Sequence, residues 1–386
     1  RVMYEMSGNK YAVMGPALEW KKAYDQQDFV IQQYPNMTSF TVQSVDLFLP
    51  TTEWLEYDSY ESPATHFNRH YARCHVTHLG ETVNPFVSPY QVAQSAAKHL
   101  GEENCFDPDA YKVPFFESTD AARQYWAEQM GRSSWDEMLA DIDHHYTETP
   151  IDEYMVYYQY KDAVSDGLPR GFATLSRKVE AYSESMLRLA RTGFPYMYPY
   201  EQEACEDYTP ICVFKEPTES PLNDSEYPLV ITTGRLPHFH HGTMRHAPFV
   251  RELMPVPELR INPQTAAEYG IEHLDWVKIT SRRGSSHARA YLTQGIAPGV
   301  LITERFWNPE CFDATQDGIT SGIEECGYNV MSADEFQNPC FATNSYRAFT
   351  VKIEKSERPE RVWVESEQFE PFMPTLQNEP VTEEVF

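Results

Sequence analysis

Six short segments between residues 228 and 353 have the length and apolar pattern of β-strands, and one helical pattern lies among them. The predicted strands cover residues 228–232, 258–262, 276–280, 288–292, 299–303 and 348–353. Pro263 and Gly270 mark the start and stop of the helix, and Arg282-Arg283-Gly284 marks a hairpin turn. Several short strands with a small helix among them favour a closed β-barrel over a sandwich, here across residues 227–355.

Prolines interrupt the chain just before this region. Between Gly193 and Pro228 they recur at positions 195, 199, 210, 217, 221 and 228. Because proline has no amide hydrogen, this spacing disfavours regular strand ladders. We therefore expect an extended connector over residues 193–226, with a domain boundary there.

Residues 1–192 have the pattern of the C-terminal part of an α/β domain with a helical insert. The pattern predicts strands over 28–31, 45–50 and 178–182, and helices over 18–24, 89–100 and 118–130, around Met138 and Tyr154, and after residue 182. Residues 356–386 hold eight Glu against two Arg and are expected to form an acidic tail, extended over a partner surface or partly mobile.

The composition excludes several classes of function. The chain carries 31 Lys and Arg against 58 Asp and Glu, a formal net charge of −27. Because Lys and Arg drive binding to phosphate backbones and anionic membranes, neither is expected as the main partner. The sequence contains no run of about 18 apolar residues, so no membrane span is expected. It also contains no GxGxxG, P-loop, HExxH or GxSxG motif, which leaves hydrolase and kinase functions without support.

The seven cysteines are scattered and include no CxxC pair. This usage fits free thiols in a reducing compartment, so the cytoplasm is the default expectation. A zinc or iron–sulfur site built from these cysteines alone is not expected. No metal ligand is assigned anywhere in the chain.

The predicted barrel reverses the sign of the charge. From residue 227 to 310 there are nine basic and seven acidic residues, a net +2. Arginine presents a planar fork of donors that suits phosphate, and amides in a glycine-containing turn can add to it. The pattern indicates a site for an anionic cofactor; the alternative, that these charged turns are simply solvated, remains open.

An ordered set of motifs runs through the same region. It consists of TTGR (232–235), FH (239–240), RINP (260–263), AAEYGI (266–271), DWV (275–277), SRRG (281–284), APGV (297–300) and WNPE (307–310). In this order the motifs strongly resemble the C-terminal molybdopterin-dinucleotide-binding domain of the DMSO reductase family. The FH pair, residues 251–258 and the WNPE ending resemble the branch that holds acetylene hydratase and the catechol dehydroxylases.

The resemblance implies a fold, a cofactor and a set of contacts. It implies an α/β remnant followed by a double-psi-type β-barrel, and bis-molybdopterin guanine dinucleotide, with molybdenum or tungsten, as the cofactor. Thr233, Gly234 and Arg235 would approach the pyrophosphate or pterin, and Asn262 and Asp275 the guanine and ribose. The remaining implied contacts are His240, Thr243, Arg283, Asn329, Tyr346 and Arg347. Leu274 stands where the family usually has glycine.

The resemblance also implies an activity. The chain would be the C-terminal half of an oxidoreductase, because the family's iron–sulfur cysteine cluster and metal-ligating residue have no counterpart here. The implied reaction on a small-molecule substrate is reductive removal or transfer of a hydroxyl on an aromatic ring, or a hydration. An iron–sulfur electron-transfer subunit is a possible partner. A noncatalytic molybdopterin-binding module and an acidic interaction subunit remain as alternatives.

Histidines form two further candidate groups. His66, His70, Cys74 and His78 are spaced four apart and could be a metal stripe, a substrate-facing surface or ordinary packing. His240 follows the TGR motif, and either a cofactor or substrate contact or a structural role is open to it. No residue is assigned a catalytic role beyond this candidate.

Overall fold

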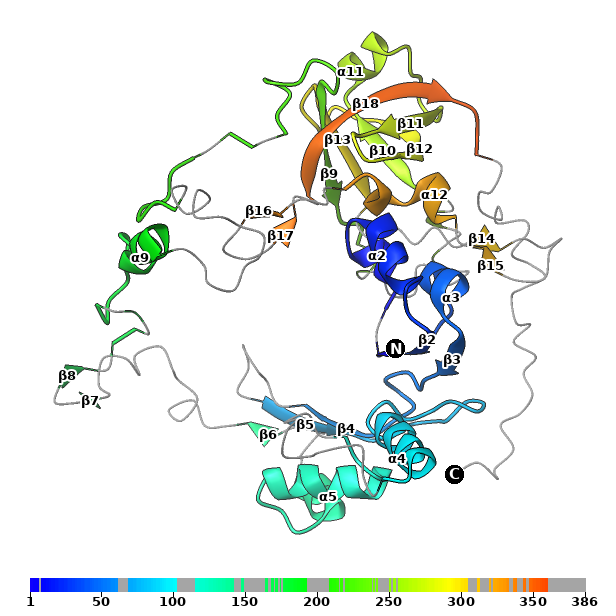
Figure 1. The fold of residues 1–386 in the computed structure, drawn as a ribbon, viewed down its shortest axis with the longest axis vertical. Helices are drawn as coiled ribbons and strands as arrows, with labels where there is room; N and C mark the ends of the chain where they lie inside the picture. The colour runs from blue at the N-terminus through cyan, green and yellow to red at the C-terminus, as the bar shows by residue number, and fades with distance from the viewer. Residues whose placement is uncertain are drawn as a thin grey trace. The chain divides into compact units, whose positions relative to one another are not determined.

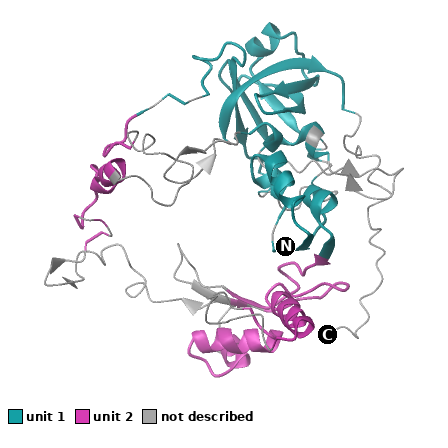
Figure 2. Ribbon diagram, viewed as in Figure 1, with its two compact units in different colours: residues 1–48, 214–386 teal, residues 49–213 magenta. Residues whose placement is uncertain are grey.

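The computed structural model describes most of the chain outside the acidic tail. The residues described are 1–6, 8–61, 69–102, 115–141, 147–148, 164–165, 168–169, 171–172, 174, 176–192, 208–214, 216–217, 219–237, 239, 241, 250, 253–254, 256–304, 311–312, 319–320, 322–332, 336–338, 343–344 and 347–359. The chain divides into two compact units, residues 1–48 with 214–386 and residues 49–213 (Figures 1 and 2).

Six strands of the first unit close into a barrel, as the sequence predicts. They are β9 (Leu229–Gly234), β10 (Glu258–Ile261), β11 (Trp276–Thr280), β12 (Ser285–Leu292), β13 (Val300–Glu304) and β18 (Ala348–Ser356). Their order around the barrel is β10-β12-β11-β18-β9-β13. The β10–β12 and β13–β9 pairs are parallel and the others are antiparallel.

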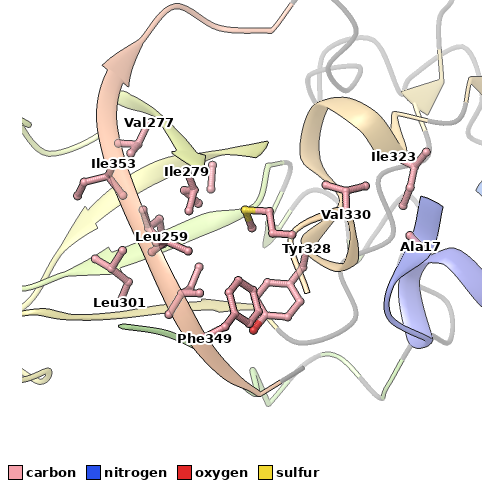
Figure 3. Packing of buried hydrophobic residues seen from close by; sticks show 14 of the residues in the cluster. Ala17, Leu259, Val277, Ile279, Leu301, Ile323, Tyr328, Val330, Phe349 and Ile353 are labelled. Carbon is pink, nitrogen blue, oxygen red and sulfur yellow. The ribbon is translucent and has the colours of Figure 1, made fainter. Parts of the chain in front are cut away.

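Alternation of apolar and polar residues places the core inside the barrel. In β10, Leu259 and Ile261 are buried while Glu258 and Arg260 are partly exposed, which is the period of two that a pleated strand imposes. Figure 3 shows the apolar cluster running from the barrel strands through Phe349, Tyr328 and Val330 toward Ile323 and Ala17. Each fully buried side chain of this kind contributes about 2 kcal/mol through the hydrophobic effect.

Three short helical segments belong to the barrel. They are α11 (Pro263–Glu268), α12 (Ile323–Cys326) and the 3₁₀ turn η3 (Tyr328–Val330). Short ladders accompany them: β14 (Cys311–Phe312) with β15 (Ile319–Thr320), and β16 (Phe336–Asn338) with β17 (Thr343–Asn344).

The N-terminal segment packs on the barrel. It forms the sheet β1-β2-β3 (Val2–Glu5, Phe29–Tyr34, Leu47–Pro50) and the helices α1 (Lys10–Val13), α2 (Ala17–Tyr24) and α3 (Ser39–Ser44). Tyr11, Tyr24 and Phe40 share one apolar cluster with residues 323–331. An apolar surface of α1–α3 is therefore buried against residues far along the chain.

The second unit has a small sheet and several helices. Its strands are β4 (Ser59–Glu61), β5 (Arg69–Arg73) and β6 (Thr147–Glu148), with a separate ladder of β7 (Val164–Ser165) and β8 (Leu168–Pro169). Its helices are α4 (Ser88–Leu100), α5 (Thr119–Gln129), α6 (Trp135–Asp141) and α9 (Glu184–Thr192). An aromatic core around Phe116, Trp126 and Trp135 joins α5 and α6.

Most predicted helix ends in this unit are confirmed. Gly101 ends α4 with a left-handed φ of 74°, and the Ser118 hydroxyl accepts from the amide of Ala121 at the start of α5. The predicted strand over 178–182 is wrong: these residues form irregular turns, with the Glu180 carboxylate accepting from the amide of Ser176. The helix predicted around Tyr154 lies outside the described residues. Within the described ranges, no helix is both long and apolar enough to cross a bilayer.

Candidate cofactor site

The TTGR motif lies where β9 leaves the barrel. Thr233 and Gly234 are the last residues of β9, which runs parallel to β13 with Gly234 opposite Glu304. A Cβ atom on Gly234 would lie 2.9 Å from Cγ2 of Ile302, so only glycine allows the two strands to pack this closely here. Beside this strand end is a hollow lined by Gly234, Arg235, Leu236, Met254, Glu258, Arg260, Ile302, Thr303 and Glu304.

Two arginines that line this hollow, Arg235 and Arg260, have guanidinium groups that could bind an anionic ligand. Arg235 is exposed and Arg260 is partly exposed, and within the residues that the structure describes neither side chain makes a hydrogen bond or an ion pair. An unpaired guanidinium can donate two parallel hydrogen bonds to a phosphate. The residues around Gly234 therefore fit the phosphate part of a dinucleotide. Arg260 was not predicted to contact the cofactor. The signal that could have found it is its alternation with the buried Leu259, which places Arg260 on the outside of the barrel.

Asn262 and Asp275, predicted to contact guanine and ribose, already have partners within the barrel. The Asn262 amide oxygen caps α11 by accepting from the amide of Gln264 at 2.9 Å, and its nitrogen donates to the carbonyl of Ile296 at 2.7 Å. Asp275 accepts from the amide of Glu272 and from Lys355, each at 2.8 Å. The Lys355 ammonium and the Glu272 amide lower the pKa of Asp275. Both side chains therefore have clear structural roles.

Arg283 holds a segment that we call the strap, residues 219–227. Its guanidinium forms a two-pronged ion pair with Glu219, and its Nε donates to the carbonyl of Met331 at 3.2 Å. The guanidinium also lies 5.6 Å from the ring centroid of Phe349. Glu219 in turn accepts from the amide of Thr350 at 3.3 Å. Since each of the three guanidinium nitrogens donates in these contacts, Arg283 anchors the strap.

Two further basic residues of the barrel pair with the strap. Arg282 pairs with Asp224 at 2.5 Å, and Lys352 pairs with Glu226 at 3.3 Å. Both cations also lie over the ring of Tyr227, at 4.9 and 5.0 Å from its centroid. From the sequence, the arginines of the hairpin turn were expected to bind an anionic cofactor. Their pairing with Asp224 and Glu219 could not be seen there, because these carboxylates are 58 and 64 positions away in the chain.

Asn329 connects the barrel to the N-terminal helices. Its side chain is buried, and its nitrogen donates to the carbonyl of Ala12 at 2.7 Å. Close by, a Cβ on Gly15 would lie 2.1 Å from Oγ of Ser332. The Asn329 amide therefore fixes the turn over residues 328–332 against α1.

The other predicted contacts are described only in part. His240, Thr243 and Tyr346 lie outside the described residues, and Arg347 is exposed at the start of β18. Of the stripe His66, His70, Cys74 and His78, the structure describes the side chains of Cys74 and His78 only, and both are exposed. Although Cys74 is exposed, partial desolvation of its thiol and the nearby Asp58 carboxylate raise the pKa of that thiol, which disfavours a thiolate ligand. Among the described residues, no group of three or more His, Cys, Asp or Glu side chains could hold a metal ion.

Leu274 adopts a backbone conformation that favours glycine. Its φ is 71°, in the left-handed region, and its amide donates to the carbonyl of Ala290 at 2.8 Å. This conformation costs a residue with a Cβ atom about 1 kcal/mol or more. The turn before β11 therefore contains backbone strain at Leu274.

Comparison with known proteins identifies the barrel. Residues 229–337 match the family model of the molydopterin dinucleotide binding domain. The chain is 39% identical over 148 residues to dopamine dehydroxylase from Eggerthella lenta, a match that covers 37% of this chain and 14% of that protein. It is 25% identical over 359 residues to a putative dimethyl sulfoxide reductase catalytic subunit from Halobacterium salinarum, covering 88% and 38%.

The solved structure of acetylene hydratase from Pelobacter acetylenicus has the same fold. It superimposes with a TM-score of 0.67 at 20% identity, covering 92% of this chain and 44% of that chain. The chain thus spans less than half the length of each of these three proteins. The matched domain and the closed barrel confirm the predicted double-psi architecture. Residues 229–337 thus form a molydopterin dinucleotide binding domain, and the chain is similar to proteins of the DMSO reductase family of molybdopterin oxidoreductases.

Proposed function

We propose that the barrel binds one dinucleotide arm of a bis-molybdopterin guanine dinucleotide cofactor in a complete oxidoreductase. The observation that carries this proposal is the end of β9, where the closely packed Gly234 leads into Arg235, whose guanidinium makes no hydrogen bond or ion pair with any residue that the structure describes. Thr233, Gly234 and Arg235 would supply backbone and side-chain donors to the pyrophosphate. When bound, the cofactor supplies two-electron redox chemistry at its metal.

The other contacts implied by the resemblance fall into two groups, residues that shape the site and residues proposed to touch the cofactor. Arg283, Asn329 and Asn262 are tied to neighbouring elements, so they shape the site rather than grip phosphate. Asp275 likewise holds the turn before β11 through Lys355. His240, Thr243, Tyr346 and Arg347 remain proposed cofactor contacts.

We propose hydroxylated aromatic compounds as the substrate class. The support is the similarity to dopamine dehydroxylase, which is highest among the three relatives compared above. The reaction would then be reductive removal or transfer of a ring hydroxyl, with hydration of an unsaturated substrate as the alternative. An iron–sulfur cluster and an iron–sulfur electron-transfer partner would serve the complete enzyme.

The decisive experiment measures cofactor content in the complete enzyme. Wild type and Arg235→Ala would be denatured, and the guanine nucleotide and pterin released would be quantified together with molybdenum and tungsten. We expect Arg235→Ala to retain less than a tenth of the wild-type cofactor, because the lost phosphate contacts are charge-assisted. Arg235→Lys should retain an intermediate amount, since lysine keeps the charge without the fork.

Lys278→Ala is the matched control. Lys278 lies on the same barrel but pairs weakly with Glu354 at 3.7 Å, so its loss should leave cofactor content unchanged. Wild-type cofactor content in a folded Arg235→Ala enzyme would show that the proposed site is wrong. Cofactor retention with no turnover of catechols or acetylene would favour the noncatalytic binding module.

A further inference from the structure

The second unit places a buried carboxylate beside an exposed histidine. Asp58 comes just before β4, and His75 follows the end of β5 by two residues. Because β4 and β5 pair antiparallel, with Ser59 opposite Arg73, the two side chains meet at one end of the ladder. The Asp58 side chain is 1% exposed and the His75 side chain 50%. The pair thus has one member inside the unit and one at its surface.

Several contacts hold the Asp58 carboxylate. Its Oδ1 accepts from the amide of His75 at 2.7 Å and lies 2.9 Å from the ring Nδ1 of the same residue. Its Oδ2 accepts from Nε of Arg123 at 2.6 Å and also pairs with a terminal nitrogen of that guanidinium. Burial disfavours the charged carboxylate, but these bonds outweigh it and lower the pKa of Asp58. The carboxylate is therefore an acceptor at neutral pH.

This acceptor fixes which ring nitrogen of His75 carries the proton. An ionised carboxylate can only accept, so Nδ1 of the neutral ring is the donor, and Nε2 is left as an acceptor. Among the residues that the structure describes, Nε2 has no hydrogen-bond partner. Since half of the side chain is exposed, a ligand can reach this nitrogen. The Asp58–His75 pair thus presents an oriented nitrogen acceptor at the surface.

Large apolar side chains lie on the two segments next to this nitrogen, residues 53–57 and 75–79. They are 41–65% exposed, and we call them the loop patch: Trp54, Leu55, Val76 and Leu79. The amide of Val76 donates to the carbonyl of Leu55 at 2.8 Å, and the amide of Leu79 donates to the Glu56 carboxylate at 2.8 Å. These bonds hold the two segments together. Exposed apolar side chains grouped in this way mark a binding surface.

The chemistry of this surface favours an uncharged aromatic ring that carries a hydroxyl. A phenolic hydroxyl donates one hydrogen bond, which suits Nε2 of His75, and the ring suits the indole of Trp54 and the aliphatic side chains of the loop patch. An anionic ligand is disfavoured, because the Asp58 carboxylate is close and the Arg123 guanidinium is already bound to Asp58 and Asp120. An aliphatic alcohol offers the same donor without a flat ring to pack on the indole.

We propose that His75 and the loop patch bind the ring of the hydroxylated aromatic substrate. In this site the substrate hydroxyl donates to Nε2 of His75, and the loop patch contacts the ring. Asp58 is a positioning residue that orients the imidazole. The assignment rests on the proposed function and deepens it, because it names residues of this chain that recognise the substrate.

The first test compares two ligands that share a ring. The complete enzyme would be titrated with catechol and with catechol dimethyl ether, which has no hydroxyl donor, and binding followed by ligand-observed NMR. We expect His75→Ala to weaken catechol binding about fivefold, the effect of one lost hydrogen bond, with less than twofold change for the ether. His78→Ala is the matched control on the same segment and should change neither affinity, because Nε2 of His78 lies 3.4 Å from the Thr82 hydroxyl.

A second variant leaves the contacts of Asp58 intact. Val76→Ser removes an apolar side chain of the loop patch but keeps the backbone bond to Leu55, so we expect it to weaken binding of both ligands about threefold. Leu100→Ser is its control, since Leu100 at the end of α4 is 72% exposed and lies outside the loop patch. This control should leave both affinities unchanged.

Steady-state kinetics with catechol give a further readout. His75→Ala should raise KM about fivefold and leave kcat within twofold, because a contact made equally in the ground and transition states changes KM alone. A lowered kcat with unchanged KM would overturn the proposal. Unchanged catechol affinity in either His75→Ala or Val76→Ser would also overturn it, and is the result expected if another part of the complete enzyme covers the loop patch. Failure of the proposed function appears separately, as full cofactor content in Arg235→Ala.

Discussion

Arg283 in the β11–β12 turn is bound to Glu219 of the strap by two hydrogen bonds, the longer of them 3.0 Å, although the residues are 64 positions apart. Their side chains are 15% and 14% exposed. Removing one partner of a mostly buried pair leaves the other charge uncompensated. The pair therefore fixes the chain segment that enters the barrel at β9.

We expect Glu219→Ala to lower the free energy of unfolding by about 3 kcal/mol, because the Arg283 guanidinium and the Thr350 amide lose their acceptor. Urea unfolding followed by tryptophan fluorescence measures this. Asp224→Asn is the matched control on the same strap, since its partner Arg282 is 48% exposed, and it should cost less. Equal losses in the two variants would contradict the central role of Glu219.

Acid should weaken the second unit through Asp58. Burial disfavours the ionised carboxylate, but hydrogen bonds from His75 and Arg123 outweigh that effect and lower the pKa of Asp58 below its usual 3.8. Since the folded-state pKa is depressed, this carboxylate stabilises the fold above about pH 4 and the contribution is lost as the pH falls through the folded value. Asp58→Asn should thus unfold at a lower temperature than wild type at pH 7.

The difference between wild type and Asp58→Asn should shrink as the pH falls below about 4 toward the depressed folded-state pKa of Asp58, because the unfolded chain then binds a proton that the folded chain does not. Thermal unfolding between pH 3 and pH 7 checks this. Asp120→Asn is a suitable control, because that carboxylate pairs with the same Arg123 but is 85% exposed. A difference that stayed constant with pH would rule out the Asp58 contribution.

Relieving the backbone strain at Leu274 should stabilise the barrel. Glycine adopts a φ of 71° without penalty, and the Leu274 side chain is 48% exposed, so little burial is lost. We expect Leu274→Gly to raise the free energy of unfolding by about 1 kcal/mol. Leu274→Ala keeps the Cβ atom and should bring no gain, and a gain from alanine equal to that from glycine would exclude strain as the cause.

Asn262 should contribute to stability rather than to base recognition. The substitution Asn262→Ala should lower the free energy of unfolding by about 1 kcal/mol, since the Gln264 amide at the start of α11 loses the side-chain oxygen that accepts from it. GMP affinity should be unchanged in the same protein. Thermal unfolding and GMP titration measure the two effects, and a loss of GMP affinity without a loss of stability would restore Asn262 as a base contact.

Local patterns predicted most of the barrel. The alternation in β9, β10 and β11 and the glycine that ends α4 depend on neighbouring residues only, so the strands and this helix end could be located in advance. The segment 178–182 alternates in the same way but forms no strand among the described residues, because alternation favours a strand only where another strand can pair with it.

The barrel strands and the order of motifs typical of a molybdopterin dinucleotide domain could be found from local residue patterns alone. The charged groups that remain available to a ligand became evident only from the folded structure. It paired Arg283 with Glu219 and left Arg235 and Arg260 unpaired among the described residues, and it joined residues 1–48 to the barrel. The physical reason is that ion pairing and burial depend on distance in space, and these partners are far apart in the chain.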